Sequence, residues 1–139
     1  MNPKEIEAQW LEELTVQWLR QLNAPGNWWV VHLLIHHGDY RHLEAVLGAS
    51  PKGVLWERCT FLEHFLRYLT NSVEQGLVSA AAAQSALDSA MQHSVALRRR
   101  ARSDKSRRRV DNIIQEVESM KKRQANKGMQ RIANKHGSR

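Results

Sequence analysis

The spacing of apolar residues constrains the fold of this chain more than any other feature. Near the start, Ile6, Trp10, Leu14, Trp18 and Leu22 recur at every fourth residue, which is the spacing of one face of an α-helix. Later segments repeat this pattern, and the sequence contains neither the strict alternation typical of strands nor the Asn-Gly pairs typical of hairpins. The sequence therefore predicts an all-α fold, a small irregular bundle of about five to six short helices with a basic C-terminal helix or arm.

Glycine, proline and short polar residues predict where the first helices begin and end. We expect a helix over residues 4–23, ended by the turn "NAPGN", and a second helix over "WWVVHLLIHH", ended at Gly38. Asn27 and Asp39 are the expected N-caps of the second and third helices, and Ser50 is that of the fourth. The first half of the chain should thus consist of closely connected helices.

Two further helices are expected in the second half. A strongly helix-forming, alanine-rich run begins at Ser79, and its weak apolar face suits close packing against another helix. A second apolar stripe lies on a different helical face, so either the chain breaks near "RSDKS", which we favour, or one long helix presents different faces to different neighbours. The residues of this second stripe are Val110, Ile113, Ile114, Val117 and Met120.

Charge divides the chain into two unlike parts. Residues 1–97 hold six Lys or Arg against ten acids, a net charge of −4, whereas residues 98–139 hold fifteen against four, a net charge of +11. Such asymmetry points to nucleic acid, an anionic membrane or an acidic partner. We therefore expect a mildly acidic helical domain over 1–97 and a basic C-terminal helical arm over 98–139 that is partly disordered without its partner.

The basic part contains the candidate binding residues for nucleic acid or an acidic partner, because clusters of Lys and Arg attract polyanions. If residues 98–109 form one helix, then Arg98, Arg102, Lys105 and Arg109 share one side of it. Arg123, Lys127, Arg131, Lys135 and Arg139 follow at every fourth residue and predict a second row. The candidate residues are Arg98, Arg99, Arg100, Arg102, Lys105, Arg107, Arg108, Arg109, Lys121, Lys122, Arg123, Lys127, Arg131 and Lys135.

The expected partner is DNA, RNA or a nucleoprotein complex. The sequence lacks zinc-finger ligands, the aromatic RNP pattern and a sustained leucine zipper, so contact with the nucleic-acid backbone and little base specificity are expected. The alternative is a protein-protein interaction module, for example an assembly factor or mobile-element-encoded inhibitor that binds a subunit surface of a nucleoprotein machine. A third interpretation is a solvated basic tail. A membrane is not the expected partner, because residues 98–109 have no apolar face to insert.

The tryptophans divide into two groups by their position on the expected helices. Trp10 and Trp18 share the apolar stripe of the first helix and are expected in the core. Trp28 and Trp29 are adjacent, so on a helix they point about 100° apart and cannot enter the same core pocket. One of them is therefore a candidate aromatic contact for a partner, and ordinary packing between helices is the alternative.

Enzymatic chemistry is not expected. His32 and His36 lie one helical turn apart, but "HLLIH" lacks the glutamate of the HExxH motif, and histidines at a helix C-terminus are favourable without any metal. Cys59 lies on the core stripe of the fourth helix, with His64 facing elsewhere, and no glycine-rich phosphate loop is present. The sequence thus predicts no catalytic residue, metal, cofactor or small-molecule substrate.

The expected location is the cytoplasm. A single cysteine cannot form an internal disulfide and is consistent with a reducing compartment. The first ten residues carry acids where a signal peptide has cations, and no segment reaches the roughly 18 apolar residues of a membrane span. The sequence does not predict an oligomeric state.

Overall fold

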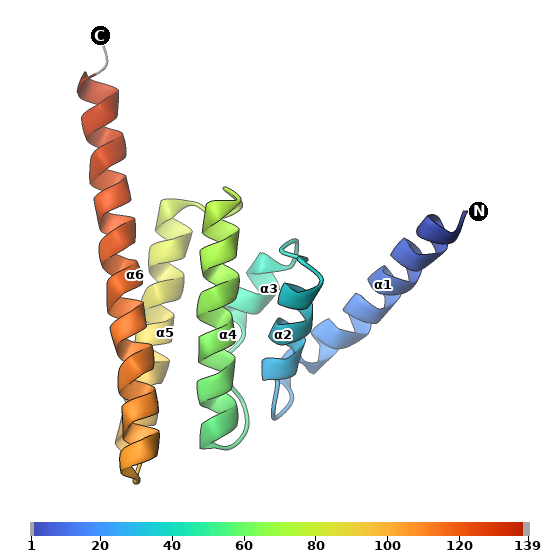
Figure 1. Ribbon diagram of the computed structural model, residues 1–139, viewed down its shortest axis with the longest axis horizontal. Coiled ribbons are helices and arrows are strands. Elements are labelled where there is room, and N and C mark those ends of the chain that lie inside the picture. The colour runs from blue at the N-terminus through green and yellow to red at the C-terminus, as the bar shows by residue number, and fades with distance from the viewer. Residues whose placement is uncertain (1, 138–139) are drawn as a thin grey trace.

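The computed structural model describes residues 2–137, and the side chains of residues 2–127. Over this range it contains six α-helices, one 3-10 helix and no strand (Figure 1), which confirms the all-α fold class. The elements are α1 (Pro3–Leu19), η1 (Arg20–Asn23), α2 (Trp28–His36), α3 (Leu43–Gly48), α4 (Leu55–Glu74), α5 (Ala80–Arg100) and α6 (Asp104–Gly137).

The three long helices α4, α5 and α6 form one side of the bundle. α5 and α6 lie side by side and run in opposite directions, while α2 and α3 pack on the other side of α4 (Figure 1). α1 projects away from this body, at the far side of α2 from α6 (Figure 1). Among the described residues, α4 supplies more core side chains than any other helix, and two phenylalanines flank its apolar stripe. The buried apolar residues of α4 are Cys59, Phe61, Leu62, Phe65, Leu66, Tyr68 and Leu69.

The hydrophobic core extends across residue 97. α6 contributes Val110, Ile113, Val117 and Met120, each at most 5% exposed, to the same cluster as the side chains of α4 and α5. Small residues of α5, such as Ala83 and Ala90, allow the close approach expected of this alanine-rich helix. The division into two domains at residue 97 stays a prediction, but the core is continuous over both parts.

The break expected near "RSDKS" is confirmed. α5 ends at Arg100 and α6 begins at Asp104. Ser103 and Ser106 cap the start of α6 reciprocally, since each backbone N–H donates to the other's hydroxyl, at 3.2 Å and 3.1 Å. Ala101 between the helices is buried, so the turn is anchored to the core.

Two expected helix starts are wrong. α3 begins at Leu43, and the Asp39 side chain accepts from Arg41 instead of capping this helix. α4 begins at Leu55, beyond Ser50, and Glu57 accepts a hydrogen bond from the backbone N–H at the start of the helix. At the start of α5, the Ser79 hydroxyl accepts a hydrogen bond from the backbone N–H of Ala82 at 3.1 Å.

Because α1 projects from the body, one tryptophan that was expected in the core is exposed. The prediction that Trp10 belongs to the core is wrong, because its side chain is 63% exposed. Trp18, two turns later, packs against the core and stacks on His37, with the ring centroids 5.6 Å apart. The apolar stripe of α1 is therefore covered only at its C-terminal end.

Among the described residues, no helix combines the length and the apolar character needed to cross a lipid bilayer.

Candidate nucleic-acid interface

One end of the bundle gathers two segments that are distant in the sequence. We define the basic pole as residues 50–58, which lead into α4, and residues 98–109, which join α5 to α6; both lie at the lower end of the molecule in Figure 1. Arg109 joins them, with its Nη1 atom 3.5 Å from the backbone oxygen of Trp56. The pole contains ten Lys or Arg and two acids, a net charge of +8. Cations of the helical body and cations of the basic C-terminal part thus lie close together at this pole.

Helix direction adds to this positive potential. α2, α4 and α6 begin at the basic pole, whereas α5 ends there (Figure 1). A helix N-terminus has a partial positive charge and a C-terminus a partial negative one. The single C-terminus is flanked by Arg98, Arg99 and Arg100 in its last turn. The pole therefore favours anions through both its side chains and its backbone.

Three arginines of the pole form ion pairs and are partly neutralised. Two of these ion pairs join residues of different helices and therefore hold those helices together. The three pairs are Arg98 Nε with Asp111 Oδ1 at 2.7 Å, Arg107 Nη1 with Asp104 Oδ1 at 3.7 Å, and Arg109 Nη2 with Glu63 Oε1 at 2.6 Å.

Five other predicted cations of the pole are exposed. Within residues 2–127, no carboxylate lies within 4.0 Å of their charged nitrogens. Exposed cations without a carboxylate partner retain the ability to bind phosphate. They are Arg99, Arg100, Arg102, Lys105 and Arg108.

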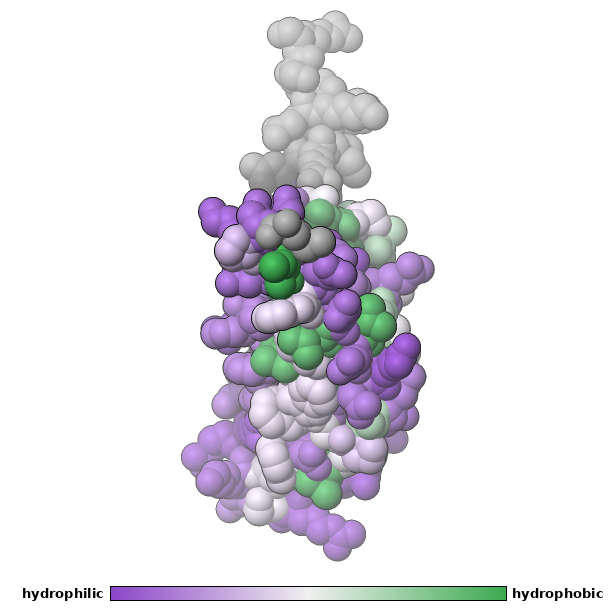
Figure 2. Space-filling view, turned by 90° about the vertical axis from the view of Figure 1, so that its right-hand side faces the viewer, coloured by the Kyte–Doolittle hydropathy of each residue, from purple (hydrophilic) through white to green (hydrophobic). Residues whose placement is uncertain are grey.

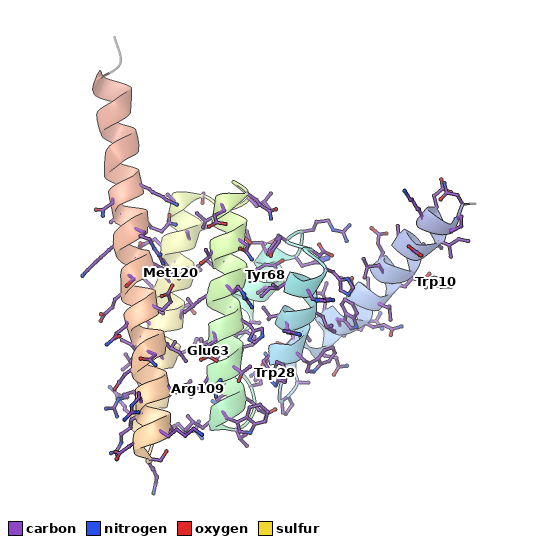
Figure 3. All side chains as sticks on the ribbon, viewed as in Figure 1. Trp10, Trp28, Glu63, Tyr68, Arg109 and Met120 are labelled. Carbon is purple, nitrogen blue, oxygen red and sulfur yellow. The ribbon has the colours of Figure 1, made fainter. Side chains whose placement is uncertain are left out.

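Arg109 has a structural role in the interface between α6 and α4. Its guanidinium donates to both oxygens of Glu63 and, at 2.8 Å, to the hydroxyl of Thr60 (Figure 3 labels Arg109 and Glu63). The hydrogen bonds to Glu63 raise the pKa of Arg109 above its already high ordinary value. Because its donors are already used, Arg109 is poorly placed to bind a phosphate.

The cationic stripe that one continuous helix over residues 98–109 would produce does not form. It requires one continuous helix, whereas the chain breaks at residues 101–103 and places Arg102 outside both helices. Arg98 and Arg109, the two ends of the proposed stripe, are engaged with carboxylates. The cations of this segment therefore surround the turn rather than forming one row.

The second group of predicted cations lies further along α6. Residues 110–120 contain three acids and no Lys or Arg, and Lys121 lies about 18 Å along the helix axis from Arg109. In this second group Lys121 pairs with Asp88 at 2.7 Å and Arg123 with Glu116 at 3.2 Å. Lys122 and Lys127 are exposed, and the side chains of Arg131, Lys135 and Arg139 lie outside the described residues. The structure thus separates the predicted residues into two clusters.

Aromatic rings lie beside the basic pole. The predicted contacts Trp28 and Trp29 are both half-buried and packed against the core. The ring of Trp28 lies 6.4 Å from that of Trp56, which lies in the first turn of α4 and is 55% exposed. Sequence reasoning missed Trp56, although its position about 100° from Leu55 on the helix takes it off the apolar stripe.

Two histidines complete the aromatic cluster. The Nδ1 atom of His32 lies 3.2 Å from Nε2 of His64, and His64 Nδ1 donates to the backbone oxygen of Thr60 at 2.8 Å. Burial lowers the pKa of His64, so this ring is neutral at pH 7 and its Nε2 accepts from His32. Among residues 2–127, no three His, Cys, Asp or Glu side chains converge as metal ligands. The pair therefore stabilises the contact between α2 and α4.

This geometry defines the protein as an all-α bundle that has many cations at one end and aromatic rings next to them. Comparison with known proteins found no match among protein-family models, curated proteins or solved structures.

Proposed function

We propose that the protein binds nucleic acid through the sugar-phosphate backbone at the basic pole, without catalysis and with little sequence preference. The observation that supports this function most directly is the group of five exposed cations that have no carboxylate partner within residues 2–127. Four of them are arginines, whose planar guanidinium groups can donate two parallel hydrogen bonds to one phosphate. Binding at this site displaces no core contact.

The shape of the pole supports low sequence specificity. Recognition of bases in duplex DNA commonly places a helix or strand pair in the major groove. The pole instead consists of helix ends and short connections, with cations on several sides of the α5–α6 turn. Such a surface suits phosphates, which have the same chemistry at every base.

Removing three of the exposed cations should weaken binding strongly. In the variant Arg100→Ala, Arg102→Ala, Lys105→Ala, we expect affinity for a short labelled oligonucleotide at low salt to fall roughly tenfold or more. The slope of log affinity against log salt on duplex DNA should become shallower by about 2–3, because up to three counterions fewer are released. Fluorescence anisotropy over a salt series measures both quantities.

The matched control removes the same charge elsewhere. Lys4, Arg20 and Arg67 are exposed and lie outside the basic pole. Their triple alanine variant should retain the wild-type affinity and nearly the wild-type salt slope. Equal losses in both variants would show that only net charge matters and would contradict a site at the pole.

A protein-protein interaction module is the second candidate function, and α1 favours it. Trp10, Leu14 and Val16 are exposed on this projecting helix. Figure 2 views the side from which α1 projects and shows hydrophobic side chains at the surface, bordered by hydrophilic ones. Within Pro3–Leu19 there are four Glu and one Lys, so the partner suited to this helix is an apolar surface with basic neighbours.

This second function predicts a partner that survives nuclease treatment. Affinity purification from the host with and without nuclease should retain the partner when binding is direct. The variant Trp10→Ala, Leu14→Ala should lose it, because exposed tryptophan is a frequent energetic centre of interfaces. A partner lost with nuclease but kept by this variant would contradict the interaction through α1.

A further inference from the structure

We infer that the nucleic acid bound at the basic pole is single-stranded, with an unpaired base stacked on Trp56; this inference rests on the proposed function. Aromatic rings beside cations are the usual elements of single-strand binding, since the rings stack on bases while the cations hold the backbone. In a duplex the base faces are stacked on each other and are not accessible to a side chain on the outside.

Trp56 has the exposure that stacking requires. Its side chain is 55% exposed in the first turn of α4, next to Val54, which is also exposed. Burying so large an apolar ring against a base would remove surface that is otherwise unfavourable in water. Among residues 2–127, only Trp10 is a more exposed tryptophan, and it lies on α1, away from the pole.

The surroundings of Trp56 hold it in place. Trp28 packs against it from α2, with ring centroids 6.4 Å apart and planes inclined by 55°. From the other side of α4, Arg109 approaches the backbone of Trp56 and the hydroxyl of Thr60 (Figure 3). The helix turn that carries the ring is thus fixed between α2 and α6, which reduces the entropy cost of binding.

Cations of α6 approach the helix turn that carries this ring. Arg109 reaches the backbone of Trp56, and Lys105 lies four residues earlier on the same side of α6, about 6 Å along the axis. Lys105 is exposed and has no carboxylate partner among residues 2–127, so a phosphate can bind there while a base of the same strand stacks on Trp56. The exposed Arg102 and Arg108 continue the cationic surface around the turn.

The charge of the basic pole also argues against a second copy of this chain as the partner that covers Trp56. Two poles of net charge +8 would face one another in a symmetric dimer at this site. Like charges at such an interface are repulsive unless counterions or acids intervene. A single-stranded nucleic acid suits both features of the site, because its phosphates bind the cations and one of its bases covers the exposed ring.

The test compares different strands and different tryptophan variants over one matched salt series. Oligothymidylate, oligouridylate and a duplex of equal length are titrated against the full-length protein by fluorescence anisotropy. We expect both single strands to bind more tightly than the duplex, because stacking requires only the face of a base. Trp56→Ala should lower single-strand affinity by about 5- to 100-fold. Trp56→Phe, which keeps an aromatic ring, should retain most of it.

Controls separate this inference from the proposed function. Trp10→Ala removes an even more exposed tryptophan outside the pole and should bind as wild type. Trp56→Ala should leave the salt slope unchanged, because no ionic contact is removed. If Trp56→Ala binds single strands as tightly as wild type, or if the duplex binds as tightly as the single strands, the stacking inference is overturned; the proposed function still stands if the pole cations are required. Failure of the wild type to bind any of the three probes overturns both.

Discussion

An aspartate in place of Val117 is expected to abolish cooperative folding or to lower the melting temperature by more than about 15 °C. Val117 is fully buried in α6, within the core shared with α4 and α5. The substitution removes apolar packing and places an unpaired carboxylate in the interior, which together cost about 4 kcal/mol or more. This is a large part of the 5–15 kcal/mol that typically stabilises a domain. Thermal unfolding followed by circular dichroism measures the effect.

An aspartate on the exposed face of the same helix provides the control. Asn112→Asp adds the same charge to α6 at an exposed position, so its melting temperature should remain close to that of the wild type. A Val117→Asp variant as stable as this control would show that α6 does not contribute to the core. Residues 1–97 would then fold as an independent unit, as the charge division predicts.

The apolar periodicity predicted the core better than it predicted the surface. The stripe over residues 110–120 and the chain break before it were both predicted from the sequence, because helical spacing and local composition determine them. The position of α1 could not be predicted in this way. Trp10 lies on a regular apolar stripe, yet α1 projects beyond the helices that would cover it. Periodicity indicates which face is apolar, not whether a neighbour is present.

The sequence predicted that the candidate site is strongly positive, but it did not predict how the cations are arranged in space. Which cations remain available depends on acids far away in the sequence: Glu63 lies 46 residues from Arg109, and Asp88 lies 33 residues from Lys121. Only the packing of α4 and α5 against α6 brings these pairs together. The same packing places Trp56 beside the basic turn, a juxtaposition that the sequence alone did not indicate.

Local capping rules failed where side chains were used for long-range contacts. Asn27 occupies the N-cap position of α2, but its side chain does not bond to this helix. Its amide nitrogen instead donates to the backbone oxygens of Leu22 at 2.7 Å and Ser50 at 2.9 Å, and its Oδ1 accepts from the N–H of Lys52 at 3.1 Å. One buried side chain thus joins the turn before α2 to the connection before α4.

Asn27→Ala is therefore expected to lower the free energy of unfolding by about 2–4 kcal/mol, since it leaves buried backbone groups without partners. For a chain of this size the melting temperature should fall by about 8–15 °C. The same hydrogen bonds hold Trp28 near Trp56, so the variant should also weaken single-strand binding without removing any cation or aromatic ring. Thermal unfolding and anisotropy titration below the lowered transition measure the two effects.

Two controls distinguish the hydrogen bonds of Asn27 from its size and position. Asn23→Ala truncates an exposed asparagine at the end of η1 and should leave the melting temperature nearly unchanged. Asn27→Asp keeps the shape and the acceptor for Lys52, but a carboxylate cannot donate to the oxygens of Leu22 and Ser50 and would repel them. Asn27→Asp should therefore be at least as unstable as the alanine variant at neutral pH. It should regain part of its stability as the pH falls, because burial beside two carbonyl oxygens favours the protonated carboxyl, which can donate. A pH-independent melting temperature for this variant, relative to wild type, would contradict the network.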